Sequence, residues 1–180
     1  MFRYFFPDSY AKDVSDVQYG DLKSNGIVNL LFDIDNTLSP VAVPEPDVKT
    51  IDLIARLKDM GFNICLLSNG GYKRAARFAA PLGVPFVAKA GKPASKGLNN
   101  ALGAIDAITA NTAVIGDQIF TDILCGKRNN IYAALVRPVS GHEQWYIKLK
   151  RVLEAPVLTR YFKKQRAALK NGAPNDRAPS

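Results

Sequence analysis

Two aspartates, Asp33 and Asp35, stand directly after an apolar run. In an extended chain, side chains two positions apart emerge on the same side, so these carboxylates repel each other unless a cation lies beside them. Oxygen ligands of this kind suit a hard divalent ion such as Mg²⁺. One carboxylate can attack phosphorus to form an aspartyl-phosphate, while the other protonates the leaving alcohol and later activates water. The spacing therefore predicts Asp33 as the nucleophile and Asp35 as the general acid/base.

A second polar cluster, Ser68-Asn69-Gly70-Gly71, follows the apolar run Asn63–Leu67. Its hydroxyl, amide and backbone N–H groups suit the oxygens of a phosphate. The same residue types after a strand also make an ordinary turn. The assignment of Ser68 and Asn69 to phosphate binding therefore depends on the other clusters.

Lys92 and two further aspartates complete the set of candidates. Lys92 precedes Pro93 at the expected start of a helix, where its ammonium group could offset the charge of the nucleophile and the phosphoryl group. Asp117 follows an apolar run and is predicted to bind the metal; Asp122, in the next helical turn, is predicted to lie behind the metal ligands or to hold Lys92. Most lysines are surface groups, and acidic residues at helix starts are often caps.

The elements that must position these residues alternate along the chain. Continuous apolar runs, typical of strands covered on both faces, are Ile27–Phe32, Asn63–Leu67, Pro85–Ala88, Thr112–Ile115 and Tyr132–Val136. Helical patterns between them are Pro46–Met60, Tyr72–Leu82, Pro93–Ile105 and Phe120–Asn129. This alternation predicts an α/β fold with a doubly wound parallel sheet. Ligands bind outside the carboxyl ends of such strands, where all of the clusters fall.

The segments DIDNT, SN, KP and GDQIFTD, in this order, resemble the four motifs of the haloacid dehalogenase-like (HAD) superfamily and cover residues 27–136. The resemblance implies a HAD-like Rossmannoid fold and a phosphatase with an aspartyl-phosphate intermediate. It further implies Mg²⁺ held by Asp33, the backbone carbonyl of Asp35, and Asp117. No residue of the matched motifs is missing, which speaks against a relative that has lost catalysis.

The intervals between the motifs are too short for an inserted cap domain. Thirty residues separate Thr37 from Ser68, and 22 separate Asn69 from Lys92, which the expected helices and strands already fill. We therefore expect a single capless domain with an open site. Such a site suits a large substrate, a protein, or a phosphate presented at a membrane surface.

The N-terminal segment FFPDSYAKDVSDVQYGDLKSNGI and the overall length resemble the YqeG-like branch of HAD subclass IIIA, which is related to phosphatidylglycerophosphate phosphatases. The resemblance implies that phosphatidylglycerophosphate loses its terminal phosphate to give phosphatidylglycerol. We divide the chain into an N-terminal arm (1–26), the catalytic core (27–140), a basic amphipathic helical segment (141–168) and a disordered tail (169–180).

Positive charge is concentrated at the C-terminus. Residues 141–180 hold nine Lys/Arg and three acidic residues, which supply +6 of the net charge of +8. Basic and aromatic residues suit an anionic membrane surface, and the candidate contacts are Trp145, Tyr146, Arg160, Tyr161, Phe162, Lys163 and Lys164. The segment could equally dock on its own domain through a helix on either side of Pro156, or serve only as a solvated face.

Two alternatives to a lipid phosphatase stay open. A phosphatase acting on soluble sugar phosphates, nucleotides or phosphoproteins would use the same site. A protein associated with nucleic acid or ribosomes could use the basic tail, although motifs of the RNP or KH type are missing. With two unpaired cysteines and no apolar run long enough to span a bilayer, we expect a cytoplasmic protein, peripheral on the inner face of the membrane if it binds lipid. The sequence determines neither the leaving group nor the oligomeric state.

Overall fold

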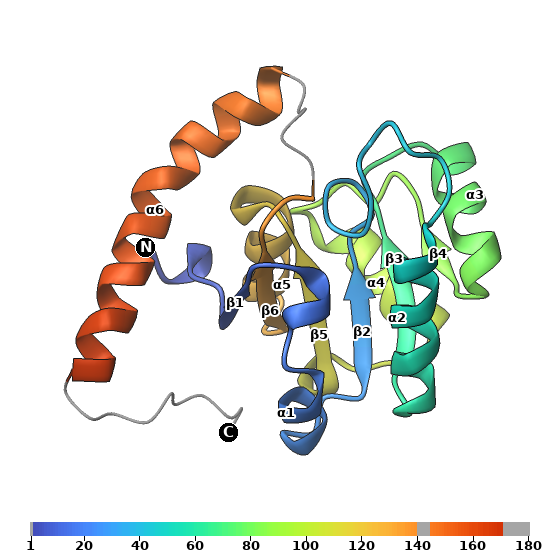
Figure 1. The fold of residues 1–180 in the computed structure, drawn as a ribbon, viewed down its shortest axis with the longest axis horizontal. Helices are drawn as coiled ribbons and strands as arrows, with labels where there is room; N and C mark the ends of the chain where they lie inside the picture. Colours follow the sequence, from blue (N-terminus) through green and yellow to red (C-terminus); the bar gives the residue numbers. More distant parts are fainter. Residues whose placement is uncertain (1, 140–144, 171–180) are drawn as a thin grey trace.

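One parallel six-stranded sheet forms the centre of the molecule (Figure 1). The computed structural model describes residues 2–139 and 145–170. In the sheet order β1-β6-β5-β2-β3-β4, the strands are β1 (Ser9–Ala11), β6 (Tyr132–Val136), β5 (Thr112–Gly116), β2 (Asn29–Phe32), β3 (Asn63–Leu67) and β4 (Phe86–Val87). All neighbouring strands are parallel, which confirms the predicted fold class.

Helices cover both faces of the sheet. They are α1 (Tyr19–Ser24), α2 (Val48–Asp59), α3 (Tyr72–Leu82), α4 (Ser95–Ala104), α5 (Leu124–Arg128) and α6 (Trp145–Lys170), with a π-helical turn (Ile119–Ile123) directly before α5. Side chains of β2 alternate between two cores: Leu30 and Phe32 join the core that includes residues of α2 and α3. Leu31 joins the core that includes residues of α4 and α5. The continuous apolar run of β2 thus serves two buried faces.

The chain reverses its direction across the sheet between β2 and β5. From β2 it adds β3 and β4 on one side, and it then returns to place β5 and β6 on the other side. Phe32 is in register with Ile115, and the Asp33 N–H donates to the Ile115 carbonyl at 2.9 Å. The residues that follow β2 and β5 therefore lie side by side at the carboxyl edge, where doubly wound sheets bind ligands.

Both intervals between the motifs are filled by core elements. A loop (38–47), α2 and β3 lead from Thr37 to Ser68, and α3 and β4 lead from Asn69 to Lys92. These intervals are fully described and contain no inserted domain. The expectation of a capless fold is therefore confirmed.

The N-terminal arm contributes a strand that the sequence pattern does not predict. Ser9–Ala11 pairs with Ala134–Val136 and forms the edge strand β1. The adjacent Asp8 carboxylate accepts hydrogen bonds from the Lys127 ammonium at 2.6 Å and from the Ala133 N–H at 2.9 Å. Three residues are too few to show a periodicity, so this strand is specified by its partners.

Helix α6 is continuous through Pro156, where the sequence predicts an interruption. Glu154, Val157 and Tyr161 are buried on one face of this helix, at spacings of three and four residues that place side chains above one another. Contacts of this face hold the helix on both sides of the proline. The predicted tail falls partly on residues 171–180, which lie outside the described residues. Among the described helices, none combines the length and the apolar character that crossing a membrane requires.

Candidate active site

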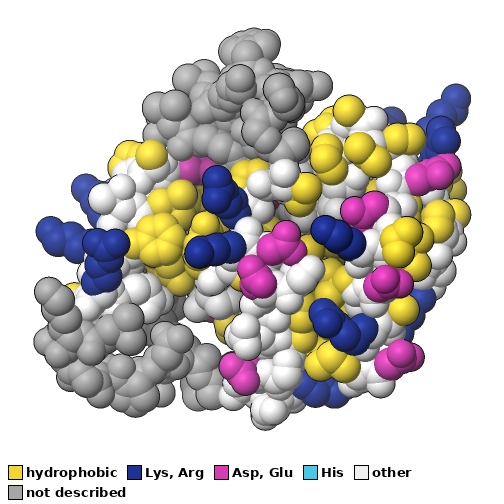
Figure 2. Space-filling model, in the orientation of Figure 1, with side chains coloured by type: hydrophobic (Ala, Val, Ile, Leu, Met, Phe, Trp, Pro, Cys, Tyr) yellow, Lys and Arg dark blue, Asp and Glu magenta, His cyan; other side chains and the backbone are white. Residues whose placement is uncertain are grey.

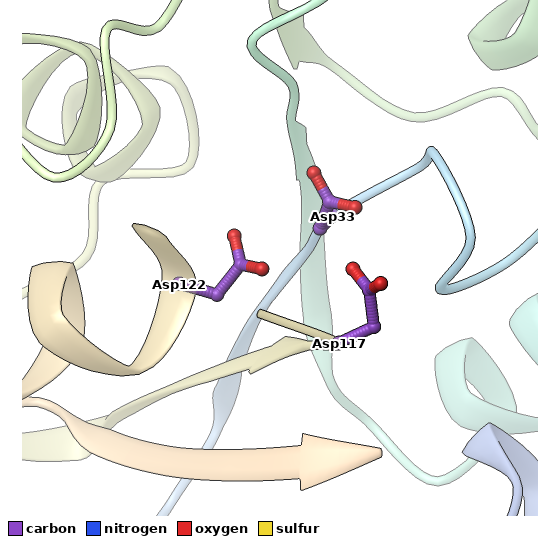
Figure 3. Close-up of side chains that lie close together, drawn as sticks. All are labelled: Asp33, Asp117 and Asp122. Carbon is purple, nitrogen blue, oxygen red and sulfur yellow. The ribbon is translucent and has the colours of Figure 1, made fainter. Parts of the chain in front are cut away.

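Three carboxylates meet at the carboxyl edge of the sheet (Figure 3). Asp33 follows β2, Asp117 follows β5, and Asp122 lies in the π-helical turn. Each offers an oxygen within 4.8 Å of the others, and all three residues are buried. The structure thus brings together three of the aspartates that the sequence singled out.

Lys92 lies between two of these carboxylates. Its ammonium Nζ is 2.6 Å from Asp33 Oδ1 and 2.6 Å from Asp122 Oδ1, and its side chain is 2% exposed. Of the two predictions for Asp122, the structure therefore favours the contact with Lys92. The second Asp122 oxygen accepts the Gln118 N–H at 3.2 Å, which fixes the carboxylate from the other side.

Asn69 holds the backbone of Lys92. Its side-chain oxygen accepts the Lys92 N–H at 2.8 Å, and its amide nitrogen donates to the Lys92 carbonyl at 3.2 Å. Both ends of the Asn69 amide are therefore used within the protein. Its predicted contact with phosphate stays a prediction, and the structure gives Asn69 a second task, which is to place Lys92.

The buried charges do not balance. Asp33, Asp117 and Asp122 carry three negative charges when ionised, and Lys92 supplies one positive charge. Burial raises the pKa of Asp33 from 3.8 to about 7. The charge of Lys92 lowers this pKa, whereas the charges of Asp122 and Asp35 raise it further. Burial alone would lower the pKa of Lys92, but Asp122 and Asp33 outweigh it and hold that pKa above its usual value of 10.5. A residual charge of −2 and a set of hard oxygen donors fit a divalent cation.

Thr37 was not assigned a role from the sequence, although it belongs to the first motif. Its hydroxyl Oγ1 lies 3.2 Å from Asp33 Oδ2 and 3.2 Å from Asp117 Oδ1. Since a hydroxyl has one hydrogen, it donates to one of these carboxylates at a time. Thr37 thereby relieves part of their repulsion by donating to either Asp33 or Asp117.

Asp35 lies apart from the three-carboxylate cluster. Its Oδ1 accepts from Arg74 Nε at 3.1 Å and from Arg74 Nη2 at 3.0 Å. Its Oδ2 faces Gly70, in the turn after β3. A Cβ added at Gly70 would lie 3.1 Å from that oxygen and 3.0 Å from Ser68 Oγ. Ser68 is buried, and its Oγ accepts the Gly70 N–H at 2.9 Å. Arg74, too, was not singled out from the sequence, because arginine on a helix surface is common.

Glycine at position 116 is required for the shape of the site. A Cβ on Gly116 would come within 2.3 Å of Asp122 Cγ. Real side chains do not approach so closely, so a larger residue would displace the Asp122 carboxylate from Lys92. Gly116, directly before Asp117, thus leaves the space that Asp122 needs to reach Lys92.

Glu154 connects α6 to the turn that carries Asp122. Its Oε1 accepts the Ile119 N–H at 2.8 Å and the Phe120 N–H at 3.4 Å, and the residue is 2% exposed. Nothing in its spacing marks Glu154 as different from other acidic residues. A buried carboxylate supplied by the C-terminal helix therefore caps the start of the π-helical turn.

We expect Glu154→Ala to lower the free energy of unfolding by about 1–3 kcal/mol, because the buried Ile119 N–H and the partly buried Phe120 N–H lose their acceptor. Urea denaturation would measure the change. Glu45→Ala is the matched control, since Glu45 is 56% exposed in an ion pair with Arg77, and exposed pairs contribute about 0–1 kcal/mol. Equal midpoints for the two variants would contradict the role assigned to Glu154.

Sequence comparisons match the chain to a hydrolase family and to proteins named as phosphatases. A profile of haloacid dehalogenase-like hydrolases matches residues 41–130. The chain is 31% identical over 157 residues to the probable phosphatase YqeG of Bacillus subtilis, a match that covers 87% of this chain and 91% of that protein. It is 30% identical over 160 residues to the chloroplastic phosphatidylglycerophosphate phosphatase 1 of Chlamydomonas reinhardtii, covering 82% of this chain and 59% of the algal protein.

Structural comparisons agree on the fold. The cobalt-bound deoxy-D-mannose-octulosonate 8-phosphate phosphatase of Haemophilus influenzae aligns with a TM-score of 0.52 at 17% identity, over 71% of this chain and 77% of that one. NagD of E. coli aligns with a TM-score of 0.51 at 16% identity, over 64% of this chain and 90% of the other. At such identities the likeness concerns the fold alone.

Proposed function

The chain belongs to the haloacid dehalogenase-like hydrolase family as a phosphatase, and on that premise we propose that it hydrolyses phosphomonoesters through an aspartyl-phosphate on Asp33. The observation that carries the proposal is the buried contact between Asp33 and Lys92 at the end of β2. It places a carboxylate beside a fixed ammonium group, next to the turn of Ser68. A carboxylate nucleophile, a cation and a phosphate-binding turn are the components that phosphoryl transfer requires.

In the first step, an oxygen of Asp33 attacks phosphorus and the bond from phosphorus to the leaving oxygen breaks. Asp35 gives its proton to that oxygen, so that the alcohol leaves neutral. Water then attacks the aspartyl-phosphate while Asp35 takes up a proton, and phosphate leaves with Asp33 restored. Lys92, Ser68 and Asn69 bind the phosphoryl oxygens, and Lys92 offsets the charge that the transition state spreads over them.

We assign the divalent ion of this reaction as Mg²⁺. The ion would be held by the carboxylates of Asp33 and Asp117 and by the backbone carbonyl of Asp35. Asp122 would lie behind these ligands, paired with Lys92. Carboxylate and carbonyl oxygens are the ligands that Mg²⁺ takes, and the residual charge of the site has the matching sign and size. When bound, the ion supplies positive charge against the phosphoryl oxygens.

For the substrate we propose phosphatidylglycerophosphate, which would be converted to phosphatidylglycerol. The proposal is supported by the algal relative and by a second one, from Arabidopsis thaliana, that is 24% identical, both named phosphatidylglycerophosphate phosphatase 1. The absence of a cap in the described core leaves the site open to a lipid headgroup. We expect the protein to attach peripherally to the membrane that presents this lipid.

The basic face of α6 supports this choice of substrate. Arg160, Lys163, Lys164 and Arg166 are exposed, and Lys and Arg side chains gather over α6 on the left of Figure 2. Each such charge near an anionic surface contributes roughly 1 kcal/mol to binding. Tyr161 is 6% exposed, lies against Phe6 and holds the helix to its own domain instead. The side chains of Trp145 and Tyr146 lie outside the described residues.

The test is phosphate release from phosphatidylglycerophosphate in anionic liposomes with Mg²⁺, beside a panel of sugar phosphates, nucleotides and phosphopeptides. We expect the lipid to be turned over with a kcat/KM at least about tenfold above that of any soluble ester, a difference of about 1.4 kcal/mol in transition-state stabilisation. Chelation by EDTA should abolish this activity, and Mg²⁺ should restore it. Turnover restricted to soluble esters would overturn the lipid assignment and retain the phosphatase.

A further inference from the structure

The acid/base aspartate is held by a residue for which the reaction as described above has no task. Two nitrogens of Arg74 share Asp35 Oδ1, at 3.1 Å for Nε and 3.0 Å for Nη2. The two side chains are 18% and 24% exposed, so solvent screens the pair only in part. A planar guanidinium group fixes the orientation of a carboxylate more tightly than a point charge does.

Arg74 is itself fixed from several sides. Nη2 also donates to the Pro40 carbonyl at 3.3 Å, and Nη1 donates to the Val43 carbonyl. The guanidinium carbon lies 5.3 Å from the ring centre of Phe78, which is fully buried. One side chain from α3 therefore joins Asp35 to the loop that leads from the first motif to α2.

This arrangement leaves one oxygen of Asp35 outside the contact with Arg74. Oδ1 is taken by Arg74, whereas Oδ2 is directed to the turn of Ser68 and Gly70. A rotation that moves Oδ1 away from the guanidinium group would break both contacts with Arg74. Without those contacts, Asp35 would sample other rotamers at the partly exposed mouth of the site.

We propose that Arg74 is a positioning residue that holds Asp35 in place to protonate the leaving oxygen. The proposal rests on the function proposed above, because it needs Asp35 as the proton donor. It predicts an effect that depends on the leaving group. An alkoxide requires a proton as it departs, whereas p-nitrophenolate departs without one, so the loss of a well-placed acid should slow the first reaction and spare the second.

The experiment compares Arg74→Met with wild type in the first turnover, before hydrolysis of the aspartyl-phosphate limits the rate. The alkyl esters are phosphatidylglycerophosphate and glycerol 3-phosphate, and the aryl ester is p-nitrophenyl phosphate. We expect release of the alcohol to slow by about tenfold to a hundredfold, and release of p-nitrophenolate to stay near the wild-type rate. An equal loss for both classes, or no loss for either, would overturn the proposal.

Arg77→Met is the matched control on the same helix, since Arg77 is 60% exposed and pairs with Glu45. It should leave both rates unchanged. Arg74→Lys is the substitute variant if Arg74→Met does not fold. Lysine keeps the charge but cannot make the forked contact, so this variant should show the same selective loss to a smaller extent.

In an Asp35→Asn background, Arg74→Met should add no further loss of alkyl ester cleavage; an additive loss would show that Arg74 acts independently of Asp35. Failure of the proposed function itself would appear separately, as activity that survives Asp33→Asn.

Discussion

In the Asp33→Asn variant, the rate of phosphate release from every substrate is expected to fall by about 10⁴-fold or more, the scale seen when a nucleophile is removed. An amide is too poor a nucleophile to form the phosphoryl intermediate. Phosphate release measured with Mg²⁺ tests this directly. Turnover retained within about tenfold of wild type would overturn Asp33 as the nucleophile.

The same variant should become more stable than wild type in the metal-free protein at alkaline pH. Asp33 has a pKa of about 7 in the folded protein and an ordinary value of 3.8, so folding favours its protonated form. Protonation of Asp33 in the folded protein contributes its full stabilisation below the ordinary pKa of 3.8, and this stabilisation is lost as the pH rises through about 7. Asparagine carries no charge to bury. Thermal melting in EDTA should therefore give a higher Tm for Asp33→Asn at about pH 8 and a smaller difference at about pH 5, and a difference independent of pH would contradict this explanation.

The second large effect is expected from Lys92→Met. Methionine has a similar length but leaves Asp33 and Asp122, each 2.6 Å from the ammonium group, without a positive partner. Removing one member of a buried ion pair costs about 3–5 kcal/mol, so urea denaturation of the metal-free variant should show a loss of this size. Turnover should fall as well, by about 10²–10³-fold, because the transition state loses a fixed positive charge.

Two comparisons separate the role of Lys92 from a general effect of removing a lysine. Lys96→Met, at an exposed position of α4, should change stability by less than about 0.5 kcal/mol. Combining Lys92→Met with Asp122→Asn should recover part of the lost stability, because the substitution removes one of the unpaired charges. If the double variant is less stable than Lys92→Met alone, the charge imbalance is not the cause.

The sequence alone predicted the fold class and several of the residues that gather at the carboxyl edge, but it did not mark Thr37 or Arg74. Continuous apolar runs separated by helical patterns predicted the parallel sheet, because burial on both faces makes consecutive residues such as Leu30, Leu31 and Phe32 apolar. Polar clusters placed directly after those runs predicted that Asp33, Ser68, Lys92 and Asp117 meet at one edge. These inferences succeed because strand direction and the position after a strand are local properties of the chain.

Contacts between distant side chains were decided by the tertiary structure. Arg74 pairs with Asp35, and Glu154 caps the turn of Ile119, yet neither residue differs in its local sequence from an ordinary surface arginine or glutamate. The strand Ser9–Ala11 is likewise defined by the edge of β6, and the helix passes through Pro156 because Val157 and Tyr161 pack beyond it. Such contacts depend on how helices are rotated and placed against the sheet. Periodicity shows which face of a helix is buried, but the partner that each buried group meets is fixed only when the whole chain has packed.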